Sequence, residues 1–85
     1  MINNKRLKKV PIQYQSKVRK TISDLIESVI QERTRRKISQ DKFAEMLNLS
    51  YKTYQAYEQG SRKPSVETLV LMFLILDLPL LHIKK

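Results

Sequence analysis

The amino-acid sequence predicts an all-α protein, a compact bundle of four to five helices with a basic N-terminal arm. Apolar side chains recur at intervals of three and four residues from position 16 onward, which is the period of a helix with one buried face. Three serines each stand just before an apolar segment, where a helix N-cap is expected. With 85 residues the chain has room for one hydrophobic core. We therefore expect an arm over residues 1–15 and a helical domain over 16–85.

The arm and the first helix are distinguished by their patterns. Residues 1–15 show no helical period and contain Pro11, so we expect an arm with a short extended piece at 10–14. The first helix is expected to end within the basic run 33–37, because cations stabilise the negative end of a helix dipole. Its apolar face is predicted to consist of Val18, Ile22, Leu25, Ile26, Val29 and Ile30.

Two short helices are predicted next. Ser39 is expected to cap the first, over 39–47, and Ser50 to cap the second, over 51–58. Asn48 lies between them, and asparagine tolerates the left-handed backbone that a tight turn requires. The two segments therefore have the form of a helix-turn-helix unit.

The last predicted helix is apolar on nearly every side. Gly60 is expected to end the preceding helix, and Ser65 to cap the new one with Glu67 in its first turn. A helix as apolar as 67–77 has to be covered on more than one face. Pro79 is expected to stop it, and a short fifth helix or an extended tail is expected to follow.

Charge and composition narrow the class of partner. The formal net charge is +9, and residues 1–37 carry eleven Lys or Arg against three acids. This imbalance indicates an acidic partner: nucleic acid, an anionic membrane surface or an acidic protein. There is no cysteine and one histidine, so neither a disulfide nor a metal site is expected. Without a nucleophile–base pair or a phosphate-binding loop, we expect no enzyme activity and no cofactor.

The location is expected to be cytoplasmic, with no membrane partner. The first twenty residues are basic and polar and lack the apolar core of a secretion signal. The longest apolar run, 69–76, is too short to span a bilayer.

One segment resembles a known helix-turn-helix family, the XRE-like family of Cro and phage repressors. The segment is residues 38–69, ISQDKFAEMLNLSYKTYQAYEQGSRKPSVETL. The resemblance extends over roughly 20–81 and departs from the family at Asn48, where glycine is usual. It implies a lambda-repressor-like fold, a double-stranded DNA partner and a recognition helix over 50–58. The matching positions are Ser39, Gln40, Phe43, Ala44, Leu49, Ser50, Tyr54, Tyr57, Glu58, Gly60, Arg62, Pro64 and Leu69.

The resemblance also implies which side chains meet DNA. Tyr51, Lys52 and Gln55 are expected to face the major groove, where lysine reads guanine and glutamine reads adenine. Tyr54 and Tyr57 are expected in the core. The full set of expected DNA contacts is Gln40, Ser50, Tyr51, Lys52, Thr53, Gln55, Ala56, Arg62 and Lys63. For Lys52 and Gln55, a solvated helix face is the alternative.

Two further expectations concern the acid Glu58 and the basic arm. Glu58 is expected to pair inside the domain with Arg62 or with an arginine of the first helix such as Arg33. Residues 5–20 hold seven Lys or Arg and no acid, so the arm is expected to dock on phosphates or in a minor groove. A strand over 10–14 that pairs with the tail or a second subunit is the alternative.

These inferences together predict a repressor-like transcription regulator that binds an inverted-repeat operator as a homodimer. The dimer interface is expected to be centred on Leu74, Leu78, Leu80 and Leu81, because one small domain cannot cover so many apolar residues by itself. An antitoxin that binds a cognate toxin and also represses its own operon is the alternative. A membrane-surface or RNA-binding adaptor has only the basic arm in its favour.

Overall fold

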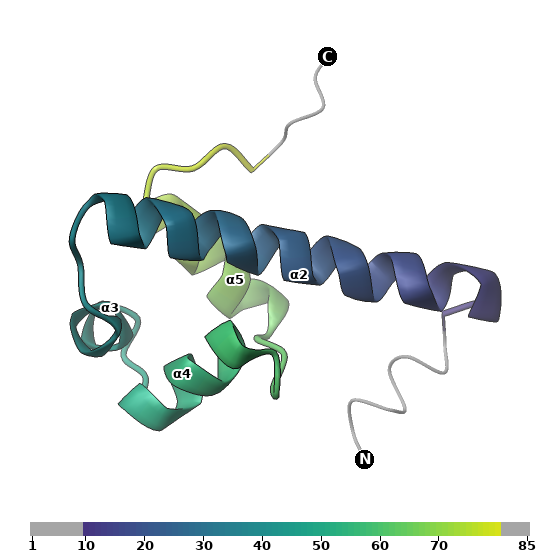
Figure 1. Ribbon diagram of the computed structural model, residues 1–85, viewed down its shortest axis with the longest axis horizontal. Coiled ribbons are helices and arrows are strands. Elements are labelled where there is room, and N and C mark those ends of the chain that lie inside the picture. The colour runs from purple at the N-terminus through teal and green to yellow at the C-terminus, as the bar shows by residue number, and fades with distance from the viewer. Residues whose placement is uncertain (1–9, 81–85) are drawn as a thin grey trace.

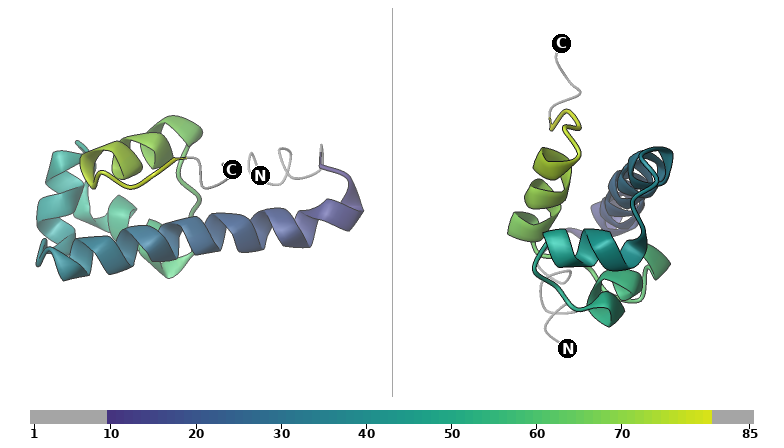
Figure 2. Two further views of the ribbon diagram at one scale, coloured as in Figure 1. Left: turned by 90° about the horizontal axis from the view of Figure 1, so that it is seen from above. Right: turned by 90° about the vertical axis from the view of Figure 1, so that its left-hand side faces the viewer.

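The computed structural model describes residues 10–80, and within that range the chain forms four helices and no strand (Figure 1). The helices are α2 (Ile12–Arg35), α3 (Gln40–Met46), α4 (Tyr51–Gln59) and α5 (Val66–Ile75). Short α3 and α4 meet at a corner on one side of the long α2, and α5 packs beside the C-terminal half of α2 (Figures 1 and 2). The all-α prediction is confirmed.

The first helix begins earlier than the sequence pattern predicts. α2 starts at Ile12 rather than at residue 16, so the expected extended piece at 10–14 is wrong. Pro11 stands at the helix start with φ −53°, and its carbonyl accepts a hydrogen bond from the backbone amide of Tyr14 at 2.9 Å. Amide hydrogens at the start of a helix have no partner within the helix, so a proline there loses nothing by lacking one. Pro11 therefore begins this helix instead of preventing it.

Three serine caps begin the remaining helices, as predicted. The side-chain oxygens of Ser39, Ser50 and Ser65 accept hydrogen bonds from the backbone amides three residues later, at 3.0, 3.1 and 3.1 Å. Each of these bonds satisfies an amide that has no partner within its own helix. The serines therefore determine where α3, α4 and α5 begin.

All four helices end at a residue with left-handed backbone. These residues are Lys37 (φ 60°), Asn48 (60°), Gly60 (81°) and Asp77 (57°). In each case the next residue's amide returns to the carbonyl five positions earlier, at 2.8 to 3.0 Å. This bond is characteristic of the Schellman motif. Asn48 and Gly60 confirm the prediction, whereas Asp77 ends α5 before Pro79 is reached, so proline does not stop this helix.

The residue after three of these turns is anchored in the core. Ile38, Leu49 and Leu78 are half-buried and pack against the core cluster. An apolar contact at this position commonly accompanies the Schellman motif and directs the chain back over the helix it has just left. Leu78 therefore has a role inside the domain, in addition to any role in the dimer interface where the sequence placed it.

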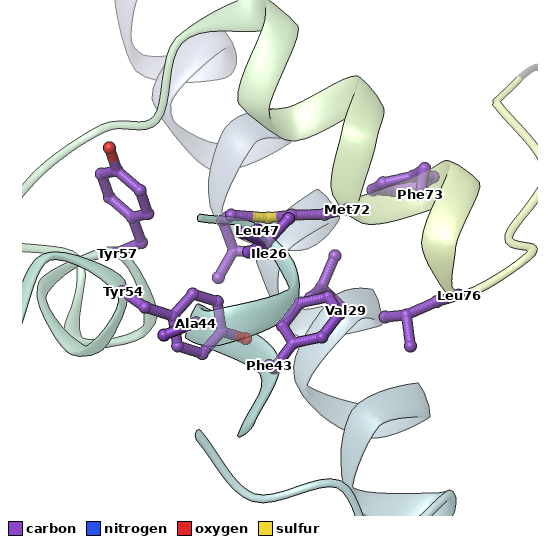
Figure 3. Close-up of a cluster of buried hydrophobic side chains, with 10 residues drawn as sticks. All are labelled: Ile26, Val29, Phe43, Ala44, Leu47, Tyr54, Tyr57, Met72, Phe73 and Leu76. Atoms are coloured by element: carbon purple, nitrogen blue, oxygen red, sulfur yellow. The ribbon is translucent and has the colours of Figure 1, made fainter. Parts of the chain in front are cut away.

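The core lies where the four helices converge (Figure 3). Phe43 and Tyr54 meet edge to face, with ring centroids 5.3 Å apart and an interplanar angle of 77°. Tyr54 and Tyr57 are both buried, which confirms that these tyrosines are core residues. The buried residues are Ile26, Val29, Phe43, Ala44, Leu47, Tyr54, Tyr57, Met72, Phe73 and Leu76.

An arginine–glutamate cluster connects the end of α2 to the end of α5. Hydrogen bonds from Arg35 and then Arg36 lower the pKa of Glu32 to about 2. The Arg36 Nη2 also donates to the backbone carbonyl of Leu76 at 2.6 Å. That carbonyl lies at the C-terminal end of α5, where a cation is favourable.

No helix within residues 10–80 is both long enough and apolar enough to cross a membrane.

The turn between α3 and α4 gives a direct test of the backbone argument. Asn48 holds a left-handed backbone at φ 60°, a conformation that alanine adopts less readily than asparagine. We therefore expect Asn48→Ala to lower the free energy of unfolding by about 1 kcal/mol. Asn48→Gly is the matched control and should change it by less than about 0.5 kcal/mol, because glycine adopts this backbone freely. Urea denaturation measures both, and equal losses would contradict the argument.

Candidate nucleic-acid interface

The first residues of α3 and α4 meet at the exposed corner of the molecule. The hydroxyl of Tyr51 donates a hydrogen bond to Gln40 Oε1 at 3.3 Å. The side-chain amide of Gln55, one turn further along α4, donates to the same hydroxyl at 2.9 Å. Tyr51 is 42% exposed, so the trio forms an ordered polar surface at the start of α4.

This surface trio is connected to a buried carboxylate. The side chain of Glu58 is 8% exposed and accepts from Arg33 Nε at 2.8 Å and from Arg33 Nη2 at 3.2 Å. Gln40 Nε2 donates to Glu58 Oε1 at 2.7 Å, and the hydroxyl of Tyr54 donates to Glu58 Oε2. The carboxylate thus receives hydrogen bonds from α2, from α3 and from its own helix α4.

The sequence left two partners open for Glu58, and the structure selects Arg33. Arg33 also donates to the carbonyl of Ile38 at 2.7 Å, so it holds the α2–α3 turn as well. Burial lowers the pKa of the Arg33 guanidinium, but the hydrogen bond and charge of Glu58 outweigh burial and raise it. Burial, followed by the hydrogen bond to Glu58, raises the pKa of the Tyr54 phenol, which therefore stays neutral at physiological pH.

The residues expected to face DNA lie on two kinds of surface. Tyr51 and Lys52 are exposed, whereas Thr53, Gln55 and Ala56 are half-buried along the side of α4. The hydroxyls of Ser50 and Thr53 are hydrogen-bonded to each other at 2.9 Å. The Ser50 oxygen is also the cap of α4, so this hydroxyl has a structural role in the free protein.

Arg62 and Lys63 follow α4 and border a groove with α2. The groove, of about 270 Å³, also receives Arg19 from α2, so three cations surround it together with Glu27. Arg19 was not named among the single DNA contacts, although it is one of the seven Lys or Arg of residues 5–20 that were expected to dock on phosphates. The sequence did not predict that Arg19 would lie beside the loop at Arg62, which is more than forty residues away along the chain.

Acidic side chains mark one border of the polar corner. Asp41 and Glu45, on the exposed side of α3, line a hollow of about 480 Å³ next to the turn at Asn48. Glu45 is paired with Lys42 at 3.4 Å. Asp41 also lines a second hollow together with Gln40 and Tyr51, so one carboxylate stands at the polar corner itself. Within residues 10–80 no group of three His, Cys, Asp or Glu side chains is placed to hold a metal ion.

Comparison with known proteins agrees with this geometry. A family model described as helix-turn-helix, of the XRE type, matches residues 29–83, which is more than half of the chain. The matched segment contains all of α3, α4 and α5 and the end of α2 from Val29. Neither the curated proteins nor the solved structures gave a match.

The buried pair of Arg33 and Glu58 predicts a large loss of stability when its glutamate is removed, and a much smaller loss when an exposed glutamate is removed. We expect Glu58→Ala to lower the free energy of unfolding by about 3 kcal/mol, because it leaves the buried Arg33 charge without its partner. Glu45→Ala removes an exposed pair with Lys42 at 3.4 Å and should cost less than about 0.5 kcal/mol. Thermal or urea denaturation measures the difference. Similar losses for the two variants would show that Glu58 does not link the helices.

Proposed function

Because the chain belongs to the XRE-type helix-turn-helix family of DNA-binding transcription regulators, we propose that it is a sequence-specific, repressor-like regulator acting on cytoplasmic DNA. It binds an inverted-repeat operator as a homodimer, one recognition helix in each half-site. The exposed start of α4 is the observation that supports this most directly. Tyr51 and Lys52 project there, and no apolar core contact requires either residue.

Base reading is assigned to four side chains of α4. Lys52 donates to guanine O6 and N7, and Gln55 pairs with adenine. Tyr51 contacts a thymine methyl or a phosphate, and Ala56 offers a further small apolar contact to a thymine. The hydrogen bond from Gln55 to Tyr51 restricts both side chains before DNA arrives. Less conformational entropy is then lost on binding.

Phosphate contacts are assigned to the groups around this helix. Arg62 and Lys63 follow the backbone beyond α4, and Gln40 reaches it at the start of α3. Ser50, Thr53 and the backbone amides at the start of α4 add uncharged donors. The side-chain amide of Gln40 already donates one hydrogen bond to Glu58 at 2.7 Å, so only its second N–H is left for a phosphate.

The homodimer is assigned to the exposed face of α5. Leu74 and Val66 are 61% and 72% exposed, and Leu71 and Leu80 are also exposed. A monomer rarely leaves such a patch in water. Residues 66–80 contain no Lys or Arg in a chain that has 17 of them, which suits contact with a second copy better than contact with DNA. Leu81, also expected in this interface, lies outside the described residues.

Two expectations are carried forward as proposals. Part of the basic arm, residues 1–9, lies outside the described range, and its docking on DNA stays a prediction. A cognate toxin is the partner that the antitoxin alternative requires in addition to DNA.

Two single substitutions separate base reading from phosphate contact. Lys52→Ala should cost about 1–3 kcal/mol on operator DNA and much less on scrambled duplex, because the base contact is lost. Arg62→Ala should weaken binding to both duplexes about equally, because a phosphate contact carries no sequence information. Titrations against an operator selected from random duplexes measure the two effects. An equal loss on both duplexes for Lys52→Ala would refute its role in base reading.

The dimer is tested by placing a charge on α5. Light scattering at micromolar concentration should give twice the 10.1 kDa mass of the chain for the wild type, and Leu74→Glu should shift it to the monomer mass. Leu74 is exposed in the single copy, so circular dichroism of the variant should be unchanged. Operator affinity should fall, because two separate monomers then bind the two half-sites independently. A wild type that stays at 10.1 kDa with operator added would refute the dimer.

A further inference from the structure

We infer that the homodimer forms by a reciprocal contact, in which the projecting N-terminal half of α2 in one copy packs against the exposed face of α5 in the other. This inference rests on the homodimer proposed above and specifies which surfaces meet. Two-fold symmetry makes the same contact twice, once in each direction.

The first of these surfaces is an apolar stripe on α2. A helix of 24 residues is about 36 Å long, and α5 covers only its C-terminal half (Figure 2). Tyr14, Val18 and Ile22 follow one another at four-residue intervals on one face and continue the line of core residues toward the projecting end of α2, with Val18 and Ile22 half-buried. Tyr14 is 54% exposed, and all three residues line a shallow hollow of about 230 Å³.

Unpaired cations border this stripe. Lys17 and Arg19 lie on its two sides by helical spacing, and neither forms an ion pair within residues 10–80. Lys20 faces away and pairs with Asp24 at 3.2 Å, and Asp24 is the first acid in α2. The projecting half of the helix therefore offers an apolar line between two free positive charges.

The exposed face of α5 has the complementary character. Val66, Val70 and Leu74 follow one another at four-residue intervals, and Leu71 lies beside them. Glu67 stands within this face at an exposed position, and no Lys or Arg occurs between residues 66 and 80. The face is thus apolar with a single negative charge in it, matching an apolar line bordered by positive charges.

Charge favours this pairing over the two self-pairings. Contact of α2 with its own copy places Lys17 and Arg19 against the same cations, which costs free energy. Contact of α5 with its own copy brings Glu67 towards its symmetry mate and leaves both α2 stripes in water. The reciprocal contact pairs opposite charges and covers both apolar surfaces in both copies. It also doubles the area, which helps a small domain to approach the roughly 800 Å² per partner of a stable interface.

Charge reversal tests the inference directly. Lys17→Glu should raise the dimer dissociation constant at least about tenfold, because an attraction becomes a repulsion at two equivalent contacts. Glu67→Lys should do the same, and the double variant should return to within about threefold of the wild type. Lys20→Glu is the matched control on the opposite side of α2 and should change little. Sedimentation equilibrium measures all four, with circular dichroism as a check on folding. Failure of the double variant to recover would overturn the pairing.

Single cysteines provide a second test, because the chain has no cysteine of its own. Val18→Cys and Leu74→Cys proteins, mixed and mildly oxidised, should form the mixed disulfide several-fold faster than either variant links to itself. Preferential self-linking of Leu74→Cys would overturn this inference while leaving the homodimer in place. A chain that is monomeric in both tests would refute the homodimer and the inference together. Operator recognition through Lys52 is measured separately and stands or falls on its own titration.

Discussion

The carboxylate of Glu58 is the contact on which the arrangement of α2, α3 and α4 depends. A buried negative charge is tolerated only when it is paired and its oxygens are hydrogen-bonded. Here the partners are Arg33 from α2, Gln40 from α3 and Tyr54 from α4 itself. The angle between the two helices of the helix-turn-helix unit is therefore set from inside the domain. Since Gln40 also accepts from Tyr51, the same contact holds the surface that is proposed to read DNA.

The helix ends show which parts of the fold could be read from residue type. Serine caps, Gly60 and Asn48 are local signals, because their side chains or backbone freedom act within a few residues. Lys37 adopts the same left-handed backbone without such a signal, and Asp77 carries only the weak signal that aspartate tolerates this conformation. Their conformation follows from the next residues, Ile38 and Leu78, which pack on the core. A turn determined by distant packing cannot be predicted from its own composition.

The same distinction applies to the candidate site. The resemblance to the helix-turn-helix family, combined with helical spacing, was enough to separate the buried tyrosines from the outward-facing Tyr51 and Lys52. It could not predict the chain of hydrogen bonds from Gln55 to Glu58, because the Gln40 bonds span 11 and 18 residues. Those bonds depend on how closely the starts of α3 and α4 approach. The placement of Arg19 beside the loop at Arg62 likewise depends on how α2 crosses α4.

The length of α2 has a consequence for its dynamics. Its C-terminal half carries the buried Ile26 and Val29, so we expect the amides of these two residues to exchange with solvent mainly through global unfolding. No residue of its first two turns belongs to the core cluster, so we expect these turns to fray at much lower free energy. One continuous helix therefore spans a gradient of local stability. Any partner that binds the projecting half has to order it first, which lowers affinity for a given area and makes the complex easier to dissociate.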